Sequence, residues 1–439
     1  MIIGWSRGRP EENYMFDIIM NFLNGGLLHA GWLFKVIYFL IVTQLTIFAV
    51  TLYLHRSACH RGVDFHPVVT HVLRLWTWLS TGMITREWVA VHRKHHAKCE
   101  TEEDPHSPQI YGIRKVFWEG VELYRDASHR RDDMEKYGRG TPDDWIERHV
   151  YSANPYLGPT LMVLIDLALF GAVGGVIWAI QMLWIPFWAA GFVNGIGHWW
   201  GYRNFESADT STNVSPWGVW IGGEELHNNH HAFPSSAKFA LRKWEVDIGW
   251  GAIRLFEMLH LATVLRVAPT LDLRPNMHLP DGDTVKALLA HRFHVMSDYF
   301  RGVIMPTLRE DAANAVGGVK ALPRKLRRAL GNGGRWLDAS SRERMNAFTQ
   351  DHPKFATVCE FRARLAALID SGVRGAAQGL QARGRAGVSA RTDRTKEPAS
   401  RALFLPSVRR FPRRSRRPAV APLGTPARGA TPRRLRPPS

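Results

Sequence analysis

The chain has 439 residues, 45% of them hydrophobic, so it can bury a large core in water or in lipid. Its formal charge of +18 would suggest a nucleic acid or an anionic membrane as partner. However, residues 371–439 alone hold 17 basic and 2 acidic residues, a net charge of +15, so the first 370 residues carry only +3. We therefore expect no specific nucleic-acid partner. Three widely spaced cysteines argue against a disulfide framework and favour a reducing compartment.

Long apolar runs near the N-terminus predict membrane contact. Residues 33–54 are almost wholly apolar and long enough for a transmembrane helix, with Lys35 close enough to the end to snorkel. Residues 1–32 contain a shorter run, 16–32, which is broken by polar residues and glycines and is compatible with a re-entrant segment. In residues 67–85 His71 and Arg74 are mixed with apolar residues, which favours an interfacial amphipathic helix over a second crossing.

A second apolar region runs from residue 157 to residue 200 and carries one charge, Asp166. At about 20 residues per crossing it can form a hairpin of two spans, 160–180 and 182–199. Asp166 is expected at a helix end near the interface. The segments that flank the apolar regions are rich in Lys and Arg, which places them on the cytoplasmic side of a multi-pass protein.

Two histidine triplets have the spacing i, i+3, i+4, which brings side chains to one face of a helix, so their imidazoles are expected to converge on one point. They are His92, His95 and His96, and His227, His230 and His231. Repeated on one side of a membrane protein, such triplets are better explained by metal binding than by a solvated polar face.

Three more histidines accompany the triplets. His55 and His60 flank the cytoplasmic end of the first span, and His198 ends the apolar hairpin with Asn194 one turn before it. The resulting nine candidate ligands exceed one tetrahedral zinc site and predict two metal ions. Imidazole ligands suit zinc, copper or iron, and the spacing does not choose among them.

These segments resemble the three histidine boxes of the integral-membrane fatty acid desaturases: His55-Arg-Ser-Ala-Cys-His60, His92-Arg-Lys-His95-His96 and His227-Asn-Asn-His230-His231. The similarity extends to the stearoyl-CoA desaturase-like branch, and in detail to its bacterial members. It rests on Glu87-Trp88 before the second box, Asp104-Pro105-His106 after it, the Asn194 to His198 segment, and Gly223-Glu-Glu-Leu before the third box. The resemblance covers about residues 33–269.

The resemblance implies an oxygen-dependent acyl desaturase that introduces a cis double bond, at the family's Δ9 position, into a long saturated acyl chain. It implies two iron ions, O2 as co-substrate, and two electrons from an external donor of the ferredoxin, flavodoxin or reductase type. The iron ligands would be His55, His60, His92, His95, His96, His198, His227, His230 and His231, with Asn194 acting through a water. The enzyme would lie among membrane lipids, in a bacterial inner membrane, with its active site on the cytoplasmic face.

Five other residues are candidates for supporting roles. Trp88 and Trp199 are candidates to line an acyl tunnel, although interface anchoring explains each equally well. Asp104, Glu224 and Glu225 flank the boxes and are candidates to orient ligand rings, although helix-capping or surface roles are equal alternatives.

The expected fold is therefore all-α: a membrane helical domain at 33–270 with a cytoplasmic cap that carries the di-metal site. Residues 271–370 read as a cytoplasmic helical appendix. Residues 371–439, rich in Arg, Pro, Ala and Gly, are expected to be disordered and dispensable for activity. Two other functions stay open: a membrane di-iron hydroxylase or ketolase, and a histidine-rich metal-binding protein or transporter.

Overall fold

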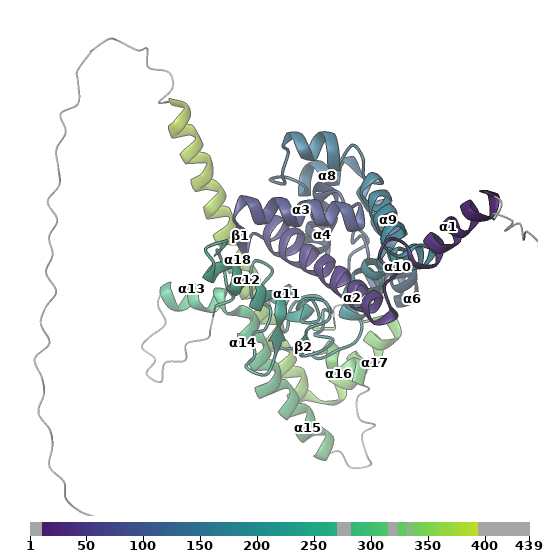
Figure 1. Cartoon of the computed structure of the whole chain (residues 1–439). Coiled ribbons are helices and arrows are strands. Elements are labelled where there is room, and N and C mark those ends of the chain that lie inside the picture. The colour runs from purple at the N-terminus through teal and green to yellow at the C-terminus, as the bar shows by residue number, and fades with distance from the viewer. Residues whose placement is uncertain (1–10, 270–281, 315–323, 332, 335–336, 394–439) are drawn as a thin grey trace, which may run out of the picture. The chain divides into compact units, whose positions relative to one another are not determined.

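The computed structural model describes residues 11–269, 282–314, 324–331, 333–334 and 337–393 (Figure 1). The chain divides into two units, Met1–Ala377 and Gln378–Ser439. Helices dominate, which confirms the predicted all-α class. The helices of the membrane and cap regions are α1 (Glu11–Gly25), α2 (Trp32–Phe48), η1 (Ala49–Cys59), α3 (Pro67–Thr81), α4 (Thr85–Lys98), α5 (Pro108–Tyr111), α6 (Ile113–Trp118), α7 (Gly120–Ser128), α8 (Arg131–Tyr137), η2 (Glu147–Tyr151), α9 (Leu157–Phe170), α10 (Ala172–Ile185), η3 (Pro186–Gly195), η4 (Ile196–His198), α11 (His227–Ala232) and α12 (Ile248–Met258).

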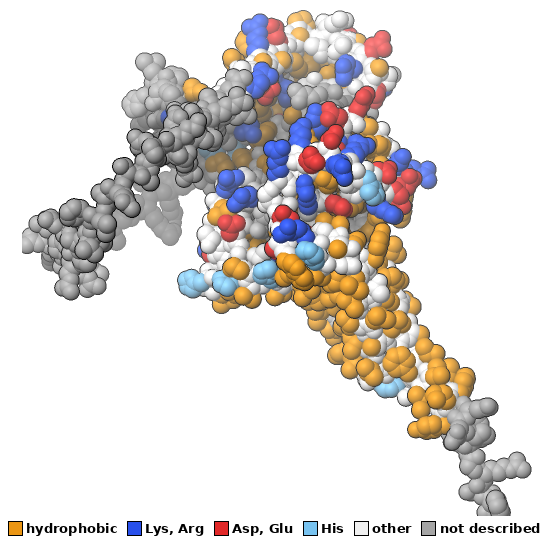
Figure 2. Space-filling model, turned by 90° about the horizontal axis from the view of Figure 1, so that it is seen from above, with side chains coloured by type: hydrophobic (Ala, Val, Ile, Leu, Met, Phe, Trp, Pro, Cys, Tyr) orange, Lys and Arg blue, Asp and Glu red, His pale blue; other side chains and the backbone are white. Residues whose placement is uncertain are grey.

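Two continuous helices among the described residues are long and apolar enough to cross a membrane. One joins α2 to η1 over Trp32–Cys59, with a mean hydropathy of 2.1, and the other joins α10, η3 and η4 over Ala172–His198, with a mean hydropathy of 1.7. Both end at candidate ligands, because His55 and His198 lie in their last turns. Figure 2 shows hydrophobic side chains gathered on the part of the molecule that leads to the N-terminal helix, whereas charged side chains gather on the rest of that face.

The turn of the apolar hairpin lies at Gly171, so the predicted spans 160–180 and 182–199 are wrong in their bounds. Gly171 has φ of +64°, a conformation that suits glycine, and a Cβ there would meet the carbonyl oxygens of α1. Gly174 lets α10 approach α9 at the carbonyl of Asp166. Asp166 lies about one turn before Phe170, the last residue of α9, so it is near a helix end as expected. It is fully buried inside α9 and accepts a hydrogen bond of 2.5 Å from Tyr38 in α2.

The first helix, α1, includes part of residues 16–32, which were predicted to form a partial or re-entrant segment. After it, the amides of Leu27 and Leu28 donate to the carbonyls of Ala168 and Leu169, so this turn lies beside the end of α9. The segment expected to be interfacial forms α3, which ends at Gly82 with φ of +67°. One side of α3 buries Arg74, whose guanidinium binds Asp144 and Glu147.

Four short strands join distant parts of the cap. The strand β1 (Val63–Phe65) pairs antiparallel with β4 (Ala262–Val264), and β2 (Trp217–Gly218) pairs parallel with β3 (Val246–Asp247). Under the first pair lies a core of Leu52, Val63, Phe65, Ala237, Ile253 and Ala262. This core fixes η1, which carries the first histidine box, against the segment that follows the third.

The C-terminal appendix forms its own helices: α13 (Gly282–Ala290), α14 (Arg292–Tyr299), η5 (Phe300–Ile304), α15 (Met305–Asn314), α16 (Arg324–Ala329), α17 (Ala339–Asp351) and α18 (Pro353–Asp393). Ile304, Leu308, Leu330 and Phe355 are part of its separate core. The last helix continues to Asp393, past residue 371, where disorder was expected to begin, and residues 371–393 contain no proline to interrupt it. The rest of that tail, 394–439, lies outside the described residues.

Candidate metal centre

The nine candidate histidines converge in the cap from four elements. The helix η1 carries His55, with His60 at its C-terminal cap, and α4 carries the second box. His198 ends the long apolar helix, and the third box forms α11. The imidazoles lie in two groups of five and four.

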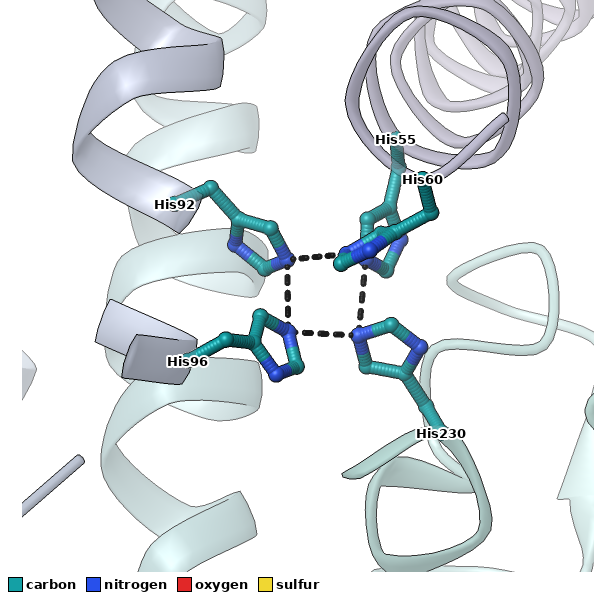
Figure 3. A group of neighbouring side chains, drawn as sticks. All are labelled: His55, His60, His92, His96 and His230. Carbon is teal, nitrogen blue, oxygen red and sulfur yellow. Dashed lines mark hydrogen bonds between the residues drawn. The ribbon is translucent and has the colours of Figure 1, made fainter. Parts of the chain in front are cut away.

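The first group contains His55, His60, His92, His96 and His230 (Figure 3). Their Nε2 atoms are separated by 3.1 Å for His60 and His92, 3.1 Å for His92 and His96, 2.9 Å for His96 and His230, and 3.0 Å for His230 and His55. An imidazole nitrogen carries at most one hydrogen, so it cannot donate a hydrogen bond to each of two neighbouring nitrogens. Two ligands at right angles around a metal, each about 2.1 Å from it, would lie about 3.0 Å apart. The spacing therefore fits imidazoles around a metal ion.

The second group contains His95, His198, His227 and His231. Nε2 of His198 lies 3.2 Å from that of His95 and 3.0 Å from that of His227. The ring of His231 packs 4.4 Å from that of His227, and among the described residues its buried Nε2 has no hydrogen-bond partner. Cys99, which the sequence gave no role, has its sulfur 3.9 Å from Nε2 of His95, within reach of this group. A metal ion would satisfy these atoms.

The expectation that each triplet converges on one point is wrong. In α4 the i, i+4 pair His92 and His96 faces the first group, whereas His95 faces the second. In α11 the i, i+4 pair His227 and His231 faces the second group, whereas His230 faces the first. Neighbouring residues on a helix differ by about 100°, so the adjacent histidines of each triplet point to different groups.

Burial keeps most of these imidazoles neutral, the form that can bind a metal. It lowers the pKa of His60, His92, His96, His227 and His230 well below the ordinary value. Burial also lowers the pKa of His231, to about 4, although the Asp209 carboxylate opposes this. At neutral pH these nitrogens therefore offer lone pairs rather than protons.

Carboxylates bind the outer nitrogens of four histidines. Oδ1 of Asp104 lies 2.9 Å from Nδ1 of His95, and Oε1 of Glu224 lies 2.8 Å from Nδ1 of His55. Burial disfavours the Asp104 charge, but His95 outweighs this and lowers the carboxyl pKa. Each carboxylate accepts the Nδ1 hydrogen and leaves Nε2 free for a metal.

Two further carboxylates were missed from the sequence. Oδ2 of Asp209 lies 3.1 Å from Nδ1 of His231, and Oε1 of Glu100 lies 3.2 Å from Nδ1 of His198. Glu100 had a signal, because it lies only four residues after the last histidine of the second box. Asp209 lies in an irregular loop with no periodic pattern, and only the folded chain brings it to the site.

Glu225 does not share the position of its neighbour Glu224. Its carboxylate accepts hydrogen bonds from the backbone amides of Trp220, Ile221 and Gly223, at 2.8, 2.9 and 3.1 Å. Glu225 thus holds the backbone of the loop before α11, which is neither a contact with a ligand ring nor a helix cap, since the N-cap residue of α11 is Leu226.

A cavity of about 580 Å³ opens beside both groups. Its lining includes His55, His92 and His227, together with Trp88 and Asn194. Trp88 stacks on His92, with ring centroids 4.9 Å apart and an interplanar angle of 15°. Apolar residues of η1, α4, α7, α10 and η3 form much of the remaining lining, which also includes Glu87, Arg125 and His129. The cavity can hold an apolar ligand of the usual size for a buried binding site.

Trp199 differs from Trp88. Its side chain is 50% exposed and it is not among the residues that line the described cavity. Trp199 therefore does not line the described cavity, and its exposure at the end of the long apolar helix suits the interface-anchoring alternative.

Comparison with known proteins places these features in one family. The fatty acid desaturase family matches residues 30–249, half of the chain. An sn-1 stearoyl-lipid 9-desaturase of Anabaena variabilis is 31% identical over 228 residues, which cover 50% of this chain and 79% of that protein. A Delta-9 desaturase-like protein of Arabidopsis thaliana is 31% identical over 52% of this chain and 75% of its own length. An acyl-CoA 5-desaturase of Anemone leveillei is 30% identical over 50% and 68%. The chain belongs to the fatty acid desaturase family.

Proposed function

We propose that this protein is an oxygen-dependent fatty acyl desaturase with two histidine-bound iron ions, which forms a cis double bond, at the Δ9 position, in a saturated long-chain acyl substrate. The observation that carries the proposal is the pair of imidazole groups beside one largely apolar cavity. The nine histidines His55, His60, His92, His95, His96, His198, His227, His230 and His231 would be the ligands. Asn194, which lines the cavity, would hold a water at the second site.

An unactivated carbon–hydrogen bond explains the need for such a centre. The bond offers neither an acidic proton nor an electrophilic carbon, so general bases and nucleophiles are of little use and a redox cofactor must supply the chemistry. The bound irons would supply the oxidising power of O2. Overall, one O2, two electrons and two protons would be consumed, two hydrogens would leave adjacent carbons, and two waters would be released.

The residues of this chain would position the substrate and the ligands. The cavity would hold the acyl chain so that only certain carbons reach the two groups, and Trp88 would press against the chain beside His92. The carboxylates of Asp104, Glu100, Asp209 and Glu224 would keep the imidazoles in the tautomer that leaves Nε2 free.

The setting follows from the apolar helices and the family. We propose a multi-pass protein of a bacterial inner membrane whose site faces the cytoplasm, where an external ferredoxin, flavodoxin or reductase can deliver electrons. The relatives are named for both lipid-linked and coenzyme A-linked acyl groups, so either carrier is compatible with the proposal.

Expression of the full-length chain in a host that cannot make unsaturated fatty acids tests the proposal. We expect monounsaturated chains in the extracted lipids, with the double-bond position read by gas chromatography and mass spectrometry. His230→Ala in the same host should give none, while its membrane fraction still contains the protein. A hydroxy or keto acid in place of an alkene would indicate a hydroxylase or ketolase, and metal uptake without oxygen consumption would indicate a transporter.

A further inference from the structure

Among the described residues, the C-terminal appendix, which lies beyond the residues matched by the family, makes its backbone contacts with the catalytic part of the chain at a segment before the third histidine box. This support segment comprises residues 203–211, between His198 and the third histidine box. Ser297 in α14 accepts a hydrogen bond of 2.9 Å from the amide of Glu206. Arg301 in η5 donates from Nη2 to the carbonyls of Arg203 and Asn204, at 3.1 and 3.3 Å. The appendix thus holds the backbone at the start of the support segment.

Aromatic packing strengthens this contact. Phe205 is fully buried, and its ring lies 4.8 Å from that of His294 in α14 and 5.2 Å from that of Phe233. Phe293 of α14 also packs against Phe233, which directly follows α11. Helix α14 therefore covers an apolar surface that links the support segment to the end of the third box.

From the support segment, hydrogen bonds lead directly into the third box. The amides of Asn204 and Phe205 both donate to Oδ1 of Asn228, at 2.8 and 2.9 Å, and Asn228 donates back to the carbonyl of Phe205 at 3.0 Å. The side chain of Asn204 donates to Oδ1 of Asn229 at 2.8 Å. Asn228 is completely buried and directly follows His227, so the position of the segment fixes that of His227.

The same segment carries or binds two of the orienting carboxylates. Ser207 donates to Asp209 at 2.7 Å, and Asp209 binds Nδ1 of His231. The amide of Thr210 donates to Oε1 of Glu100 at 2.8 Å, and that oxygen binds Nδ1 of His198. Three of the four histidines in the second group, namely His198, His227 and His231, are thus aligned through the support segment.

The first group is aligned by other parts of the chain. His55 is held by Glu224, and Arg93 donates to the carbonyls of Ala58 and Cys59 and so fixes the first box against α4. His230 packs on Phe239, with ring centroids 4.8 Å apart. Among the described residues, these contacts of the first group do not pass through the support segment.

We propose that α14 and η5 are positioning elements of the second metal site, so that the appendix completes one of the two sites and leaves the other nearly untouched. Ser297 and Arg301 are the positioning residues, and they act through residues 203–211. The proposal rests on the two-metal site of the proposed function. The proposal predicts that loss of these contacts weakens metal binding at the second site selectively. A general loss of folding would instead weaken both sites together.

The test compares two matched double variants of the full-length protein. Ser297→Ala with Arg301→Leu removes the two contacts. Ser340→Ala with Arg309→Leu makes the same chemical changes at exposed positions of the same appendix. Each purified protein is loaded with Fe(II) without oxygen, and the metal retained per chain is measured during titration with a chelator. We also record the absorption and Mössbauer spectra, which distinguish two iron environments without any turnover.

In wild type and in the control variant we expect two irons per chain. In the contact variant we expect one iron to be lost at about tenfold lower chelator concentration, as for loss of an outer partner of a metal ligand, with one spectral component retained. Arg301→Lys alone, which keeps a donor, should behave like wild type. Equal retention of both irons in the contact variant, or parallel loss of both, would overturn the inference. A wild-type protein that never binds two metals would instead refute the proposed function.

Discussion

The neighbouring residues Glu224 and Glu225 offer a sharp test of how the first metal site is held. Glu224 is buried and its Oε1 lies 2.8 Å from Nδ1 of His55, so Glu224→Gln removes a charge that orients this ring. Loss of such a partner typically weakens metal binding about 10–100-fold. At 1.36 kcal/mol per decade this is about 1.4–2.7 kcal/mol. The pair is buried, so bulk water screens it little.

Glu225→Gln is the matched control, because the same change is made one residue later. This carboxylate binds three backbone amides, so its replacement should cost about 1–3 kcal/mol of folding free energy through weakened buried hydrogen bonds, without touching a ligand ring. The assay is iron per chain during chelator titration, alongside thermal unfolding. We expect Glu224→Gln to weaken one iron, and Glu225→Gln to lower Tm while both irons stay. Equal iron loss in the two variants would refute the assignment.

Three further outcomes are expected. Trp88→Leu should lower turnover at least about tenfold or shift the double-bond position in the product analysis, because Trp88 stacks on a ligand ring in the cavity, whereas Trp199→Leu should leave both unchanged. Gly174→Ala should lower Tm by the equivalent of about 1–3 kcal/mol, since its Cβ would overlap the Asp166 carbonyl, while the open Gly175 tolerates alanine. Metal-free protein should lose stability as pH falls from about 6.5 towards 4, because the unfolded chain protonates His231 while the folded chain, with a pKa of about 4, excludes that proton; a Tm that rises on acidification would contradict this.

The identities of the nine histidines follow from the sequence, but their division into two groups does not. Helical spacing indicates which side chains share a broad face, and both triplets do face the site. The division depends on the positions of the loops and helices that pack around α4 and α11. His95 turns away from His92 and His96 because Asp104 and His198 lie on its side of α4, and neither position can be read from local spacing.

The membrane helices show a similar limit. Hydropathy predicts an apolar region from residue 157 to residue 200 but gives no sign of where it bends, because the composition is uniform. Two close contacts set the bend at Gly171: Gly171 packs against α1, and Gly174 of α10 packs against α9. Neither contact can be predicted without knowing where the other helices lie. Gly171 and Gly174 are the residues that permit the bend. Because glycine is also common inside apolar helices, these two glycines alone do not locate the bend in the sequence.

The shared helices have a consequence for how the two groups can vary. Both α4 and α11 give ligands to each group, so the separation of the groups is tied to helix geometry, and a shift of either helix moves both. The orienting carboxylates instead come from three separate loops, around residues 100–104, 203–211 and 224. Loops can move while helices stay packed. The loops, and whatever packs on them, are therefore where one site can be tuned more than the other. The contact between the appendix and residues 203–211 bears mainly on the second group, because two of its orienting carboxylates lie in or against that loop, and among the described residues it reaches the first group only through His230 in α11.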